Sequence, residues 1–255
     1  MKISWLGWVM VVLAVLALAL WAIPATKFVG EWAFRLVPVI TSVWMTVSAF
    51  KLWSVLDKRH SDEARVWSLY ALGSISIVIG TILFVVSDLA ERTKEFPMFT
   101  IIGQLFMMVF LILFMISMWR VTNLVEWKNR KFKLWIPLTV IAVGFVVSTV
   151  LTIILRNPGS FVVLPVNFFL LLDAAVFFIM WVVVGRTWGG RLSVPYIMMA
   201  VACLFISTFF VMISMRIPAI SFTMTEYPQV FFIIANTIQA LSVDTRLQIE
   251  LKLHE

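Results

Sequence analysis

The chain of 255 residues is 62% hydrophobic and only 13% charged, and its 20 Lys and Arg against 13 Asp and Glu give a net charge of +7. Soluble domains carry about 25% charged residues, so this composition excludes an ordinary water-soluble fold. The positive charge lies in short segments between apolar runs, so it indicates a lipid bilayer, and not nucleic acid, as the partner.

Eight apolar segments are long enough to cross a bilayer, which takes about 20 residues of helix. In chain order they cover residues 5–23, 34–55, 67–88, 98–119, 134–155, 161–185, 193–215 and 227–244. The sequence therefore predicts an all-α, polytopic transmembrane helix bundle of eight spans. Seven spans are the alternative, because the last segment is short and contains Asn236, Thr237 and Gln239.

The first segment follows Lys2 and ends at an Ile-Pro-Ala sequence at 23–25, which loosely imitates a secretion signal. Its apolar run is long and its cleavage site is poor, so we interpret it as an uncleaved first helix. In the second segment, Arg35 and Lys51 bracket the uncharged stretch closely. At least one of these two side chains is expected to extend toward the headgroups.

Lys and Arg residues are concentrated on one side of the predicted topology. The N-terminus, residues 51–65, 120–133 and 186–191 and the tail hold most of the 20, and the intervening loops hold few. Because positively charged loops stay in the cytoplasm, both termini of an eight-span protein are expected to be cytoplasmic, in a cell membrane.

The two halves of the chain resemble each other at a spacing of roughly 130 residues. The Leu-Val-Pro sequence at 36–38 matches Val-Leu-Pro at 163–165, and Glu-Phe-Pro at 95–97 matches Glu-Tyr-Pro at 226–228. We expect two parallel four-helix halves related by an axis along the membrane normal. Chance similarity between apolar segments is the alternative.

This repeat divides the chain into a first membrane half at 1–130, a second at 131–245 and a short cytoplasmic tail at 246–255. Within the tail, residues 247–253 alternate apolar and polar side chains with a period of two. That period favours a strand or a frayed end over a continued helix, whose period is 3.6.

The third segment carries small residues on one helical stripe: Gly73, Ser76, Gly80 and Ser87. Such a stripe lets helix backbones approach closely in lipid, so these residues are expected to pack against another helix. The partner helix could belong to the same chain or to a second copy in a homo-oligomer.

Asp173 is the one charged residue expected near the middle of a span, where an unpaired carboxylate costs several kcal/mol. We interpret Asp173, with Asn167, Gln104, Asn236 and Gln239, as a ligand-binding or relay group inside the bundle. A protonated Asp173 that bonds to a neighbouring helix is the alternative.

No cofactor or metal site is expected. No lysine lies near the middle of a predicted span to bind retinal, and the only histidines, His60 and His254, lie outside the spans. Cys203 is the only cysteine, so neither an internal disulfide nor a cysteine metal cluster can form.

Residues 80–88, Gly-Thr-Ile-Leu-Phe-Val-Val-Ser-Asp, with Phe96, Pro97 and Gln104 beyond them, resemble the Ser-Asp segment of the lysoplasmalogenases, eight-helix membrane enzymes that cleave a vinyl-ether lipid. The resemblance implies a lipid hydrolase of eight helices, and the hydrolase alternative takes Asp88 and Asp173 as its catalytic residues. The chain departs from the family in lacking a second membrane aspartate near 212–215 and an intramembrane histidine.

Two functions therefore remain. The preferred one is a non-enzymatic membrane protein that binds an apolar or weakly polar small molecule or a partner helix, as a transporter, a sensor module or an accessory subunit of a membrane protein complex. The lipid-modifying hydrolase is the alternative.

Overall fold

The computed structural model describes residues 3–90, 98–124, 163–188, 190–214 and 226–253. Within these ranges the chain is all helical and contains no strand. The elements are α1 (Trp5–Ala22), the short 3-10 helix η1 (Pro24–Thr26), α2 (Lys27–Asp57), α3 (Ala64–Ala90), α4 (Met98–Leu124), α6 (Val163–Thr187), α7 (Ser193–Ser214) and α8 (Glu226–Lys252).

The all-α class is thus confirmed for the part of the chain that the structure describes. Its seven α-helices lie where the first four and the last three apolar segments were predicted. The predicted segment at 134–155 lies outside the described residues. The total number of spans and the two-half repeat therefore stay predictions.

Four of these helical segments are long and apolar enough to cross a membrane: Trp5–Ala22, Phe28–Asp57, Ala64–Ala90 and Ile102–Leu124. Shorter apolar stretches occupy Ala175–Thr187 and Ser193–Ile206. These helices are consistent with a membrane protein, because helices satisfy their backbone polar groups internally and can expose apolar side chains to lipid.

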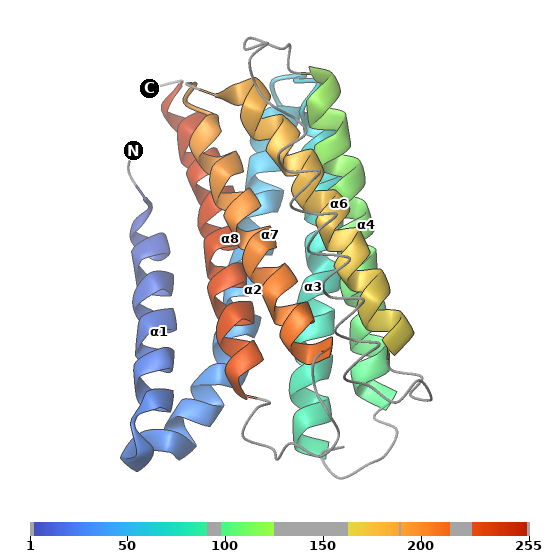
Figure 1. Cartoon of the computed structure of the whole chain (residues 1–255). Coiled ribbons are helices and arrows are strands. Elements are labelled where there is room, and N and C mark those ends of the chain that lie inside the picture. Colours follow the sequence, from blue (N-terminus) through green and yellow to red (C-terminus); the bar gives the residue numbers. More distant parts are fainter. Residues whose placement is uncertain (1–2, 91–97, 125–162, 189, 215–225, 254–255) are drawn as a thin grey trace.

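The helices stand side by side as one bundle (Figure 1). The helices α2, α3, α4, α6, α7 and α8 form a closed ring in which each contacts the next and α8 contacts α2. Helix α1 stands outside this ring and contacts α2 and α8. Asp244 near the end of α8 accepts a hydrogen bond from the backbone N–H of Ser4 at 3.4 Å, so the start of α1 and the end of α8 share one end of the bundle. We call it the termini end.

Helix α2 begins at Lys27, earlier than the predicted segment at 34, and it contains Pro38. A proline removes one backbone N–H from the helix, and hydroxyl side chains in the next turn donate back to carbonyls there. The Thr41 hydroxyl donates to the Val37 carbonyl at 2.9 Å, and the Ser42 hydroxyl donates to that of Pro38 at 2.6 Å.

Glycines allow α3 and α4 to pack closely against each other. A Cβ atom added to Gly73 would lie 3.1 Å from Leu113 Cβ, and one added to Gly80 would lie 3.1 Å from the carbonyl oxygen of Gly103. The backbones of α3 and α4 therefore come close at the Gly80–Gly103 crossing. Of the other small residues on the predicted stripe, Ser87 is buried and Ser76 is half-buried.

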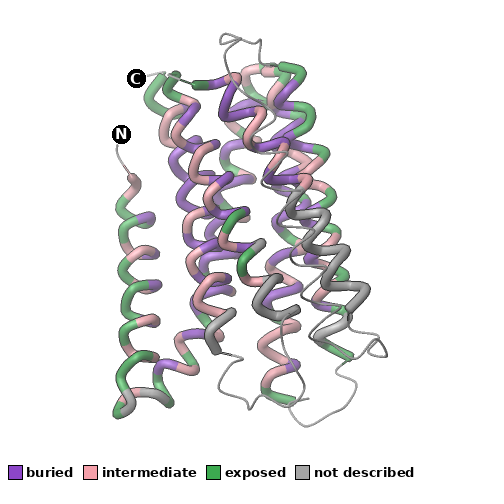
Figure 2. Tube along the Cα trace, viewed as in Figure 1, coloured by how far each residue is buried: buried purple, intermediate pink, exposed green. Residues whose placement is uncertain are grey.

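Apolar side chains lie on the outside of the bundle as well as in its core (Figure 2). The outer side of α1 is exposed, and Trp5 and Trp8 are 80% and 56% exposed. Helix α8 is the reverse, because every residue from 239 to 247 is buried, including Asp244 and Arg246.

The prediction of a strand or frayed end at 247–253 is wrong, because α8 continues without interruption through Lys252. The alternation of apolar and polar residues there does not reflect one exposed and one buried face. Polar Glu250 is buried and apolar Leu251 is exposed, because the connection between α2 and α3 covers the polar side of α8 at this level.

Candidate functional site

The most distinctive feature of the bundle is a polar stripe along buried α8. Its polar residues are Asn236, Gln239, Arg246 and Glu250, and Val243 lies between the second and the third. Successive residues of this series are three or four positions apart. At 3.6 residues per turn these positions fall within an arc of about 80°. The stripe has an uncharged part around Gln239 and a charged part around Arg246, separated by about 10 Å along the helix.

The uncharged part consists of two carboxamides without hydrogen bonds. Asn236 and Gln239 are each only 1% exposed. Neither amide atom of Asn236 has a hydrogen-bond partner among the residues that the structure describes. Those of Gln239 make no hydrogen bond of ordinary geometry there, although the Tyr70 hydroxyl is close enough to interact with this side chain. A buried polar group left unpaired costs about 1–3 kcal/mol, so this arrangement is unfavourable unless another molecule completes it.

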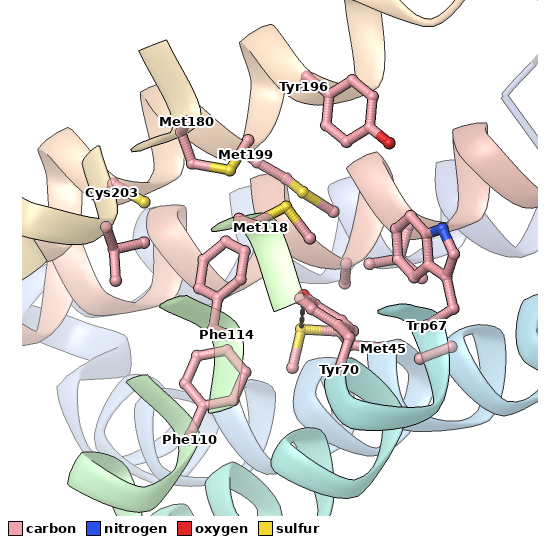
Figure 3. Close-up of a cluster of buried hydrophobic side chains, with 14 of the residues drawn as sticks. Met45, Trp67, Tyr70, Phe110, Phe114, Met118, Met180, Tyr196, Met199 and Cys203 are labelled. Carbon is pink, nitrogen blue, oxygen red and sulfur yellow. Dashed lines mark hydrogen bonds between the residues drawn. The ribbon is translucent and has the colours of Figure 1, made fainter. Parts of the chain in front are cut away.

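Three helices meet at the hydroxyl of Tyr70 on α3. This hydroxyl donates to the sulfur of Met45 on α2 at 3.3 Å, as the dashed line in Figure 3 shows. Gln239 on α8 lies beside the same hydroxyl. Sulfur is a weak acceptor, so the Tyr70 hydroxyl keeps hydrogen-bonding capacity next to the carboxamides.

Aromatic rings and methionines surround Tyr70. Its ring packs edge-on against Trp67 and Phe114, with centroids 5.3 Å away in each case, and against Phe110 at 6.1 Å. Further along this core lie sulfur-bearing side chains from α4, α6 and α7, namely Met118, Met180, Met199 and Cys203 (Figure 3). Methionine is flexible and polarizable, so such a core can adapt to an apolar guest.

The charged part of the stripe is a buried ionic cluster at the termini end. Arg246 Nη2 donates to Glu63 Oε2 at 2.7 Å, and Arg246 Nη1 donates to the carboxylate of Glu250 one turn along α8. Arg59, just after α2, donates to Glu250 Oε2 at 2.9 Å. These two cations and two carboxylates balance one another and fix the connection between α2 and α3 to the end of α8.

Arg246 is only 2% exposed, so its charge depends on its partners. Burial disfavours the charge of its guanidinium, and the carboxylates of Glu63 and Glu250 compensate for this cost. An arginine side chain stays cationic at every physiological pH. The sequence prediction assigned Arg246 to a basic cytoplasmic tail, whereas the structure places it inside the bundle.

Sequence reasoning missed this cluster for two reasons. The Arg246 and Glu250 pair at i and i+4 was a visible signal of a helix, but the alternating pattern at 247–253 outweighed it. Nothing in the local sequence indicates that Glu63, which is 183 residues away, completes the cluster.

The other predicted site residues lie elsewhere or outside the described part. Gln104 lies in α4, half-buried, and no described hydrogen bond joins it to Asn236 or Gln239. Asn167 and Asp173 lie in α6, but the positions of their side chains are outside the described part. Whether these five residues face one another therefore stays a prediction.

Asp88 is not isolated at the end of α3. Its carboxylate accepts a hydrogen bond from Arg35 Nε at 2.6 Å, and the Arg35 guanidinium also lies over the ring of Trp32, 5.2 Å from its centroid. Arg35 therefore bonds to a carboxylate of the neighbouring helix. Among the described residues, no group of three or more His, Cys, Asp or Glu side chains could hold a metal ion.

Apolar helices around a polar, buried α8 define the class of this protein as an all-helical bundle consistent with a membrane protein. The chain matches no protein-family model, and comparisons with curated proteins and with solved structures gave no match either.

Proposed function

We propose that this chain is a multi-pass membrane protein that binds a small, weakly polar molecule inside the bundle, at Asn236, Gln239 and Tyr70. The observation that carries the proposal is the pair of buried carboxamides without hydrogen bonds. Leucine would fill the same space without the cost of unpaired amide groups, so two amides at these positions favour a role in binding.

A role in which binding moves a helix, as in a sensor or a transporter, fits better than a static subunit. The carboxamides and the ionic cluster belong to one continuous helix and lie on one side of it. A ligand that displaces α8 at Gln239 would act on the contacts of Arg246 with Glu63 about 10 Å away.

The termini end is proposed to face the cytoplasm. Its exposed basic side chains include Lys51, Lys58, Arg65, Arg120, Arg191 and Lys252. Positively charged segments are retained on the cytoplasmic side. Accessibility mapping with tags at both chain ends would test this orientation, and ends found on opposite faces would contradict it.

The proposed function is tested by purifying the protein in a mild detergent and identifying bound molecules by native mass spectrometry. We expect a small molecule to copurify with the natural chain and to be lost from an Asn236→Leu/Gln239→Leu variant. An Asn123→Leu variant is the matched control, because Asn123 is exposed on α4. No bound molecule in any sample, or equal amounts in all three, would contradict the proposal.

The lipid-hydrolase alternative depends on Asp88, whose carboxylate bonds to Arg35 in the structure. Turnover of ether lipids by the purified protein, abolished by Asp88→Asn in a folded variant, would establish the hydrolase and remove the binding function.

A further inference from the structure

We infer that the ligand of the α8 site is electrically neutral and carries a polar head that both donates and accepts hydrogen bonds, on an apolar body. This inference rests on the proposed function and specifies the ligand class of the same site.

The unpaired atoms set the hydrogen-bonding character of the head. Asn236 and Gln239 each present one amide nitrogen, which donates, and one amide oxygen, which accepts, and none of the four atoms makes a hydrogen bond of ordinary geometry within the described ranges. Only Gln239 has a polar side chain, that of Tyr70, close enough to interact with it. A head that only accepts, such as an ester or ether, would leave both amide oxygens unpaired. A primary amide or a hydroxyl beside a carbonyl can satisfy both kinds of group.

The spacing of the two residues sets the size of the head. Residues three apart on a helix are neighbours on its surface, with Cβ atoms about 5–6 Å apart. The two carboxamides can therefore reach a single small head from adjacent positions. The Tyr70 hydroxyl, beside Gln239, adds a third neutral group.

The charges near the site exclude a charged head. Arg246, the cation on the same side of α8, already bonds to Glu63 and Glu250. The Tyr70 hydroxyl, which lies beside Gln239, is neutral. Among the described residues, a carboxylate or an ammonium group at Gln239 would therefore be buried without a counter-ion, which is strongly unfavourable.

The side chains around Tyr70 indicate the chemistry of the apolar part of the ligand. Trp67, Phe110 and Phe114 enclose its ring, and Met45 contacts its hydroxyl. Aromatic and thioether groups favour an aliphatic or aromatic body.

Three probes with the same alkyl chain test the inference: dodecanamide, dodecanoate and dodecylammonium. Their saturable binding is measured by equilibrium dialysis against the protein in lipid nanodiscs, with empty nanodiscs as the blank. We expect the amide to bind at least about 10-fold more tightly than either charged probe, because only the amide avoids burying an unpaired charge.

Two variants make the test specific to Gln239. Gln239→Leu is expected to weaken amide binding about 10-fold, and Gln239→Glu is expected to reverse the preference toward dodecylammonium. Asn123→Leu, on the exposed side of α4, is expected to change neither the affinity for the amide nor the preference among the three probes. The thermal unfolding of each variant is recorded, so that loss of fold is separated from loss of binding.

Binding of dodecanoate or dodecylammonium to the natural chain as tightly as the amide would overturn the neutral-ligand inference but leave interior binding intact. The absence of saturable binding for all three probes would overturn the inference and the proposed function together.

Discussion

Helices α1 and α8 lie against each other and have opposite composition and burial. Helix α1 contains no charged residue, and one narrow seam of it is buried, formed by Gly7, Met10, Ala14 and Ala17. Helix α8 carries acidic, basic and amide side chains, and its residues from 239 to 247 are buried on every side.

This difference shows that α8, the more polar of the two helices, is the more deeply buried one. In lipid, an apolar side chain loses nothing by facing outward, whereas a polar group must find a partner inside the protein. The small residues on the seam of α1 allow close contact with its neighbours, as at Gly7, where an added Cβ would lie 3.2 Å from Leu241 of α8. The polar residues on α8 bind its neighbours through hydrogen bonds and ion pairs.

The largest effect is expected from the charged part of α8. Arg246→Met leaves the carboxylates of Glu63 and Glu250 without their shared cation, and should lower the free energy of unfolding by about 3–5 kcal/mol. Thermal unfolding in detergent measures this loss of stability. Arg65→Met is the control, because Arg65 is exposed at the start of α3.

Adding Glu63→Gln to Arg246→Met should recover part of this loss, because it removes one of the unpaired charges. Equal effects of Arg246→Met and Arg65→Met would contradict a buried cluster.

The next largest effect is expected where α1 turns into α2. A Cβ atom at Gly30 would lie 2.5 Å from the Cα atom of Trp21, so Gly30→Ala must push the two backbones apart. We expect a loss of about 1–3 kcal/mol in the same unfolding experiment. Gly190→Ala is the control, since its nearest neighbour would be the Thr187 carbonyl oxygen at 3.2 Å. Equal stability of the Gly30→Ala protein and the natural chain would show that α1 is not held at this corner.

The uncharged part of α8 should respond in the opposite direction. Without ligand, Gln239→Leu should leave stability unchanged or raise it by about 1 kcal/mol, because an unpaired amide is replaced by an apolar group of similar size. Ser242→Ala on the same helix should instead lower stability by about 0.5–1.5 kcal/mol, because it removes a hydrogen bond of 2.7 Å to the Pro195 carbonyl. A loss for Gln239→Leu larger than that for Ser242→Ala would mean that the amide is already paired.

The smallest effect is expected on the outer face of α1. Trp8 is 56% exposed, so Trp8→Leu should change the free energy of unfolding by less than about 0.5 kcal/mol. A larger loss, accompanied by a smaller particle in size-exclusion chromatography, would show that a second copy or a partner helix covers this face.

The sequence was sufficient to place the helices that the structure describes, because runs of apolar residues between charged loops have few other solutions in lipid. It was less informative about polar residues. Asn236 and Gln239 stood out because amides are rare in such runs, whereas Tyr70 did not, since tyrosine also occurs at interfaces. Arg246 was interpreted as a surface cation because Lys and Arg near the end of a span usually are.

What the sequence by itself determined is the all-helical class and the positions of the described helices, since both follow from how local stretches of residues partition between lipid and water. What only the tertiary structure decided is which polar residues face one another. Glu63 meets Arg246 across 183 positions of sequence, and Gln239 meets Tyr70 through the packing of α8 against its neighbours. Such pairings depend on how whole helices pack against one another, and the local sequence does not predict this packing.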